Sequence, residues 1–88
     1  MESPVPFDAF DVALELIHRL RDPLAAIAQR DPALAQHLRR AAASVPLNLS
    51  EGRRRLGRDR IHLWRVAAGS ADEVVASLRV AEAWGHVD

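Results

Sequence analysis

The chain has 88 residues, of which 49% are hydrophobic, with four Gly, no Cys and a formal net charge of zero. This length allows one small domain, and the lack of Cys excludes disulfides and thiolate metal sites. The acidic N-terminus and the lack of an apolar run of about 20 residues indicate a soluble, cytoplasmic protein without a signal peptide or membrane contact.

The first predicted helix covers about residues 8–30 of a single domain formed by residues 1–88. Asp8 is a suitable N-cap, and apolar residues then recur every three or four positions as far as Ile27. Asp22-Pro23 interrupts this pattern, because proline removes a helical hydrogen bond and Asp-Pro is itself a good helix start. Two interpretations stay open at residues 22–23: a bend in one helix, or a restart as a second short segment.

The second predicted helix covers about residues 32–52, with Asp31-Pro32 as its start signal. The stretch "SVPLNLSEGRRR" (44–55) could be a helix end followed by a loop, or a kinked helix that continues to Gly52. The apolar stripe continues through Pro46 and favours the kink. Ser44 and Asn48 could then bond backbone groups that Pro46 leaves free.

The third predicted helix covers about residues 58–84, and Gly85 is its expected C-cap. Two apolar stripes lie side by side on it, so we expect it to contact neighbours on more than one side. Gly69 lies among small residues in the middle, where Gly costs about 1 kcal/mol relative to Ala, so another backbone is expected to approach closely there. The first stripe comprises Ile61, Trp64, Ala68, Ala71, Val75 and Leu78, and the second comprises Leu63, Ala67, Ser70, Val74, Ala81 and Trp84.

Charge is distributed unevenly along the chain. Residues 39–65 hold eight Arg and two acidic residues, a net charge of +6, and the segments on either side each have a net charge of −3. A basic middle segment can attract a polyanion, although pairing of these charges within the fold explains the pattern equally well. The candidate nucleic-acid contacts are Arg39, Arg40, Arg53, Arg54, Arg55, Arg58 and Arg60.

No sequence pattern indicates catalysis, a cofactor or a metal. The four His are scattered, without the spacing on one helix or the neighbouring Cys that a metal site would need. The Ser residues lack a motif that would supply a base or an oxyanion hole, and no Gly-rich phosphate loop is present. We therefore expect a non-enzymatic protein.

Two segments, "LRRAAASVPLNLSEG" (38–52) and "LWRVAAGSADEVVASLRVAEAWGHV" (63–87), closely resemble the four-helix bundle family of 23S rRNA intervening-sequence proteins. The accessory variability protein of diversity-generating retroelements looks like a relative of this family. The family pattern reads approximately L-R-R-A-A-x-S-[IV]-P-x-N-[IL]-[AS]-E-G, followed by A-x-G-S-x-x-E. Matching residues that the resemblance marks as structural are Ser44, Pro46, Asn48, Glu51, Gly52, Gly69, Ser70 and Glu73.

The resemblance implies an all-α, antiparallel up-and-down bundle of the four-helix type that assembles into homo-oligomeric rings, commonly pentamers. The chain ends at Asp88, where the family turns into a fourth helix. We therefore expect the fourth helix to be missing from this chain, with two alternatives: the chain is truncated, or it relies on three helices plus a partner. The apolar face of the third helix would then be partly uncovered, which predicts self-association or instability.

Two hypotheses on function follow from the charge pattern and the resemblance. In the first, a ring-forming bundle binds RNA or DNA through the Arg-rich surface. In the second, a self-assembling adaptor has protein partners, such as the reverse transcriptase that the resemblance to the retroelement protein implies. Arg39, Arg40 and Glu51 are then structural ion-pair partners across helices or subunits.

Overall fold

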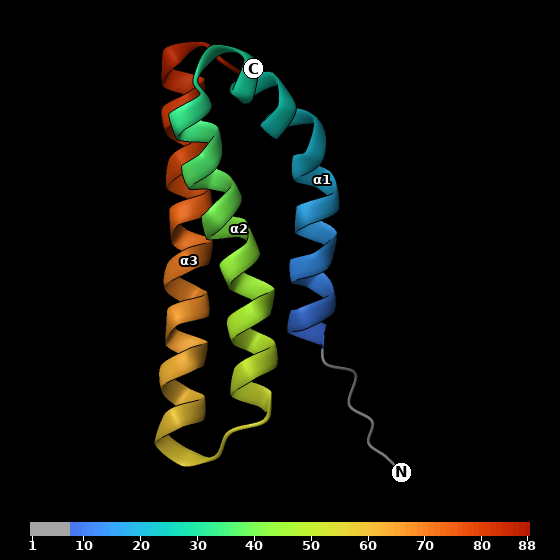
Figure 1. Ribbon diagram of the computed structural model, residues 1–88, viewed down its shortest axis with the longest axis vertical. Coiled ribbons are helices and arrows are strands. Elements are labelled where there is room, and N and C mark those ends of the chain that lie inside the picture. Colours follow the sequence, from blue (N-terminus) through green and yellow to red (C-terminus); the bar gives the residue numbers. More distant parts are fainter. Residues whose placement is uncertain (1–7) are drawn as a thin grey trace.

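The computed structural model describes residues 8–88 and contains three α-helices in this range. These are α1 (Asp8–Arg30), α2 (Pro32–Arg53) and α3 (Gly57–Trp84), and helices that follow each other in sequence run in opposite directions (Figure 1). The predicted all-α, antiparallel up-and-down arrangement is therefore confirmed. None of the three helices is long and apolar enough to cross a membrane.

α2 lies between the other two helices and packs against both, whereas α1 and α3 barely touch (Figure 1). The extents of 47 × 24 × 16 Å reflect this flattened arrangement. Each outer helix therefore has α2 as its main neighbour within residues 8–88.

The core is narrow and consists mostly of small side chains. Ile27, Leu38 and Val74, one from each helix, are the largest fully buried side chains. Full burial of such a side chain contributes about 1.5–3 kcal/mol, so these three give a domain of this size only a thin margin of stability. The buried alanines of the same cluster are Ala35, Ala41, Ala42 and Ala81, and Ala13 and Ala67 are buried outside it.

Both helices that contain an internal proline continue through it. α1 runs unbroken past Pro23 and bends toward α2 at its C-terminal end (Figure 1). α2 runs past Pro46 to Arg53, one residue beyond the predicted end. The amide of Asn48 donates to the carbonyl and to the hydroxyl of Ser44, both at 2.9 Å. These bonds stabilise the turn in which Pro46 lacks its N–H.

The segment after α3 is fixed against the start of α2. Asp31 caps α2 by accepting a hydrogen bond from the backbone N–H of Leu34 at 3.0 Å. Gly85 ends α3 with a φ of 77°, as expected for a glycine C-cap. His86 then lies with its Nε2 atom 3.4 Å from Oδ2 of Asp31, and Val87 packs against the core. These contacts close the end of the molecule that lies opposite the α2–α3 turn (Figure 1).

The two apolar stripes of α3 have different surroundings. The first stripe is largely uncovered, with exposed fractions of 50% for Ile61, 38% for Trp64 and 57% for Val75. Contact with neighbours on more than one side was expected, but α1 packs on the far flank of α2 and barely reaches α3. The second stripe packs toward α2 and is buried at Ala67, Ser70, Val74 and Ala81.

Candidate nucleic-acid interface

The turn between α2 and α3 carries the densest group of arginines. Residues 51–60 contain five Arg and two acidic residues, which gives a net charge of +3. The turn is tight, because the backbone N–H groups of Arg54 and Arg55 still bond to carbonyls of α2. Gly57 begins α3 with a φ of 57°, in the left-handed region that favours glycine. The charges of both helix ends are thereby gathered at one end of the molecule (Figure 1).

Arg60 and Trp64 of α3 hold the C-terminal end of α2. Nε of Arg60 donates to the carbonyl of Gly52 at 3.3 Å, and Nη2 donates to the carbonyl of Arg53 at 3.1 Å. These carbonyls lie in the last turn of α2, beyond the regular helical ladder, and that of Gly52 also accepts the backbone N–H of Arg55. Nε1 of Trp64 donates to the carbonyl of Leu49 at 3.3 Å, and the Arg60 guanidinium lies 5.5 Å from the Trp64 ring centroid. Arg60 therefore has a structural role.

Gly52 is buried beneath Trp64. A Cβ atom at Gly52 would lie 2.6 Å from Cδ1 and from Nε1 of Trp64, a separation that real Cβ atoms essentially never show. Gly52, expected to end the helix, lies inside α2 at a position that the approach of α3 restricts to glycine. At Gly69, in contrast, a Cβ would meet open space, so the expected close approach of a backbone does not occur there within residues 8–88.

Glu51 offsets part of the positive charge of the turn. Its Oε2 atom accepts a hydrogen bond from Nη2 of Arg55 at 2.7 Å, and its Oε1 atom lies 3.7 Å from Nη2 of Arg54. The hydrogen bond from Arg55 and its charge hold the pKa of Glu51 below the usual carboxyl value, and the same contact raises the pKa of Arg55. Arg55 also lies 4.0 Å from Asp59. Among the exposed arginines of the turn, Arg55 therefore has the largest number of acidic residues beside it.

Three further arginines of the turn, Arg53, Arg54 and Arg58, have exposed side chains. The contact of Arg54 with Glu51 is long, and the Arg54 side chain is 76% exposed. Arg58 forms no ion pair with another residue of the range 8–88. Guanidinium groups stay charged at physiological pH and bind phosphate oxygens bidentately, so the chemistry that this turn offers is anion binding.

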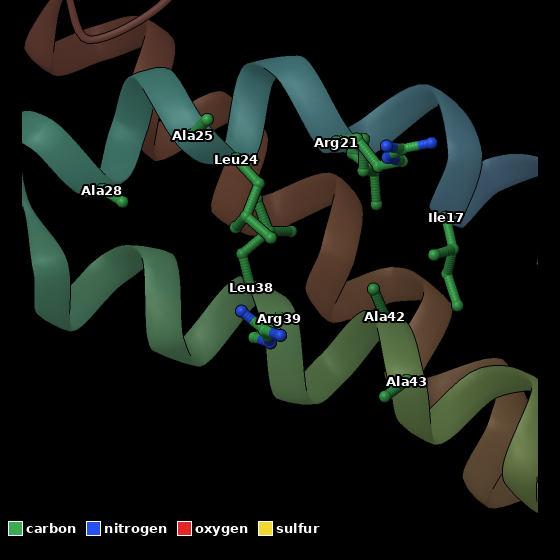
Figure 2. Close-up of a pocket in the computed structure, with 10 residues that line it drawn as sticks. Ile17, Arg21, Leu24, Ala25, Ala28, Leu38, Arg39, Ala42 and Ala43 are labelled. Atoms are coloured by element: carbon green, nitrogen blue, oxygen red, sulfur yellow. The ribbon is translucent and has the colours of Figure 1, made fainter.

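Arg39 and Arg40 lie apart from the turn. Arg40 precedes Arg53 by 13 residues, a distance of about 20 Å along a helix. Arg39 lines an apolar groove of about 460 Å³ between α1 and α2, beside Leu24 and Leu38 (Figure 2). Arg40 lines a separate hollow of about 290 Å³ between α2 and α3. The seven arginines selected from the sequence therefore do not form one continuous surface.

Several residues of the sequence motif form a polar cluster between α2 and α3. The hydroxyl of Ser70 donates to the hydroxyl of Ser44 at 2.8 Å, and Ser44 also accepts the amide of Asn48. Nearby, Oε2 of Glu73 lies 3.3 Å from Nε2 of His37. Buried polar groups require partners, so this cluster favours one register of α3 against α2. No three His, Asp or Glu side chains of residues 8–88 are grouped closely enough to hold a metal ion.

Comparison with protein families supports the relationship that the motifs indicate. The family model described as 23S rRNA-intervening sequence protein matches residues 7–88, and so includes all three helices and the basic turn. The comparisons with curated proteins and with solved structures gave no match.

Proposed function

Because the chain belongs to the 23S rRNA-intervening sequence protein family, we propose that it is a non-enzymatic, self-assembling helical bundle that binds RNA or DNA through the α2–α3 turn. The observation that carries this proposal is the net charge of +3 over residues 51–60, gathered at one end of the molecule. Phosphate contacts of this kind are independent of sequence and weaken as salt is added. An assembly presents the turn more than once and so raises a weak affinity through avidity. A ring of five remains a prediction from the family resemblance.

Within the turn, we assign the phosphate contacts to Arg54 and Arg58. Their side chains are exposed, whereas Arg60 bonds to carbonyls of α2 and Arg55 binds the carboxylate of Glu51. Arg39 and Arg40 are too far from the turn to contact the same phosphates.

The test is a fluorescence anisotropy titration with a single-stranded RNA and with a duplex DNA at two salt concentrations. Both should bind more weakly at the higher salt concentration. The double variant Arg54→Ala/Arg58→Ala should also reduce the slope of log K against log salt by about 0.7–0.9 for each lost phosphate contact.

The matched control is Arg21→Ala/Arg30→Ala, which removes the same charge from exposed positions of α1. It should leave the affinity and the salt slope nearly unchanged. Equal losses of affinity from the two double variants would mean that binding depends only on the total charge of the chain. No loss on changing Arg54 and Arg58 would overturn the assignment to the turn.

A second candidate function is a self-assembling adaptor whose partners are proteins, for example a reverse transcriptase. The exposed apolar side chains favour it, because larger apolar patches on soluble proteins mark interaction sites. Val12 on α1 is 67% exposed, in addition to the uncovered stripe of α3. Glu51 forms its ion pairs inside the turn, with Arg54 and Arg55, rather than across helices of the chain. This candidate predicts no binding of RNA or DNA at either salt concentration.

A further inference from the structure

The groove between α1 and α2 is mainly apolar and open to solvent. Its volume of about 460 Å³ lies within the range of small-molecule sites in proteins. Its α1 side extends from Ile17 to Ala28, a length of about 16 Å along the helix. Of residues 8–88, neither a residue of α3 nor a carboxylate lines it (Figure 2). A second hollow of about 240 Å³ shares Arg39 with it and extends the groove toward Pro32.

Small side chains along both helices create the space in this groove. Leu20 and Leu38 lie deepest in it, with exposed fractions of 6% and 0%. Alanine side chains end at Cβ, so the two helices leave a trough above these leucines instead of filling it. An alkyl chain that enters the trough removes apolar surface of both helices from water. The alanines that line the groove are Ala25, Ala28, Ala42 and Ala43.

Two arginines place positive charge on opposite sides of the groove. Arg21 belongs to α1 and Arg39 to α2, and both side chains are exposed (Figure 2). Neither forms an ion pair with another residue of the range 8–88. A guanidinium group can donate to both oxygens of a carboxylate, and its methylene stem can lie along apolar surface. The groove is therefore complementary to a molecule with an anionic head and an apolar body.

We propose that this groove binds a free single-chain carboxylate amphiphile, of the fatty acid class. Arg39 and Arg21 hold the carboxylate at the mouth, and the alkyl chain lies along Leu20 and Leu38. The groove contacts such a chain from two helices, whereas the uncovered stripe of α3 is the face of a single helix. The ligand also strengthens the attachment of α1, which is held mainly by α2. The inference goes beyond nucleic-acid binding, because the groove does not involve the α2–α3 turn.

Isothermal titration calorimetry with sodium decanoate, kept below the concentration at which micelles form, tests the ligand class. The wild-type chain should bind one decanoate. Octanoate, which is shorter by two methylene groups, should bind about 15-fold more weakly, because each buried methylene contributes about fourfold in affinity. Decan-1-ol and decylammonium have the same chain with a neutral or a cationic head. Both should bind at least about tenfold more weakly than decanoate, because they lack the bond from guanidinium to carboxylate.

Matched variants separate the head contact from the chain contact. Arg39→Gln should weaken decanoate binding about tenfold and leave decan-1-ol binding unchanged. Its control is Arg40→Gln, at the next residue, which lines the hollow between α2 and α3 instead. Ala25→Leu fills the groove and should weaken both ligands. Ala26→Leu, exposed on α1 outside the groove, is its control. Circular dichroism checks that each variant remains helical.

The alanine methyl groups report where the ligand lies. In a carbon–proton NMR titration with decanoate, the methyl signals of Ala25 and Ala43 should shift. The methyl signal of Ala68, on the uncovered stripe of α3, should not shift. The reverse pattern would mean that decanoate coats the exposed face of α3, and it would overturn the assignment to the groove.

Three other results would also overturn the proposal. The first is equal affinity for the three head groups, or an equal loss from Arg39→Gln and Arg40→Gln. The second is no binding of decanoate, as expected if another copy of the chain covers the groove. The third is association with vesicles of an anionic phospholipid without binding of free decanoate. The anisotropy titration depends on Arg54 and Arg58, so failure of one proposal is distinguishable from failure of the other.

Discussion

Replacing Gly52 with Ala tests the close contact between the ends of α2 and α3. The added carbon would lie 2.6 Å from two atoms of the Trp64 indole and 3.3 Å from Cβ of Leu63. The indole is held in place, because its Nε1 atom donates to the carbonyl of Leu49 and Arg60 lies against the ring. The substitution therefore forces the indole to shift and weakens the attachment of α3 to α2.

Three effects set the size of the change in the free energy of unfolding for Gly52→Ala. Overpacking costs about 1–3 kcal/mol. Loss of the hydrogen bond from Trp64 adds about 0.5–1.5 kcal/mol. In the opposite direction, Ala is favoured over Gly inside a helix by about 1 kcal/mol. We expect a net destabilisation of about 2 kcal/mol, which corresponds to a decrease in Tm of roughly 8–16 °C for a domain of this size.

Thermal unfolding followed by circular dichroism measures this effect, with Gly69→Ala as the control. Gly69 also lies inside a helix, but its Cβ position meets open space, so Ala should stabilise the chain there by about 0.5–1 kcal/mol. In a Trp64→Leu background the cost of Gly52→Ala should largely disappear. A Gly52→Ala chain that unfolds at the wild-type temperature would refute the close approach of Trp64.

Three further substitutions test individual contacts. The pKa of Glu51 is lowered in the folded chain, so its contact with Arg55 stabilises the fold above the usual carboxyl pKa, and this stabilisation is lost as pH falls through the lowered value. Glu51→Gln should therefore show a flatter dependence of Tm on pH in the acidic range, and the anisotropy titration should show tighter binding of nucleic acid. Asp31→Ala removes the N-cap of α2 and should cost about 0.5–2 kcal/mol in urea unfolding, whereas Asp31→Asn keeps an acceptor for the N–H of Leu34 and should cost less. Ser70→Ala removes the hydroxyl donor of the polar cluster and should cost about 1 kcal/mol in the same assay, and an unchanged unfolding midpoint would exclude a stabilising role for that bond.

Two helix ends, the start of α2 and the end of α3, were predictable from the sequence, because caps depend on neighbouring backbone groups. Asp31 bonds the N–H of Leu34, and Gly85 has the positive φ that ends α3. The continuous helix through Pro46 was predictable for a similar reason, since the apolar stripe continues on both sides of the proline.

The face that α3 turns toward α2 was not predictable from periodicity. The stripe that contains Ile61 and Val75 is the more apolar one, yet the stripe that contains Ala67 and Ser70 is buried. Small side chains allow α3 to lie close to α2, and the hydroxyl of Ser70 finds its partner there in Ser44. Neither effect is visible until the two helices are placed together.

The role of Arg60 could not be read from the sequence either. It belongs to the basic run, and its charge makes it a candidate phosphate contact like the others. In the structure, the guanidinium of Arg60 instead donates hydrogen bonds to the carbonyls of Gly52 and Arg53. Arg60 points inward because α2 ends beside it in space, and the sequence of the basic run does not show that.

The central position of α2 also determines the order in which the chain opens. α1 is held mainly by α2, whereas α2 and α3 share the polar cluster and the contacts of Arg60 and Trp64. Detachment of α1 therefore leaves the α2–α3 hairpin with its own contacts intact. We therefore expect two cooperative units of unequal stability, so that in a hydrogen-exchange experiment the amide protons of α1 should exchange with solvent before those of the hairpin.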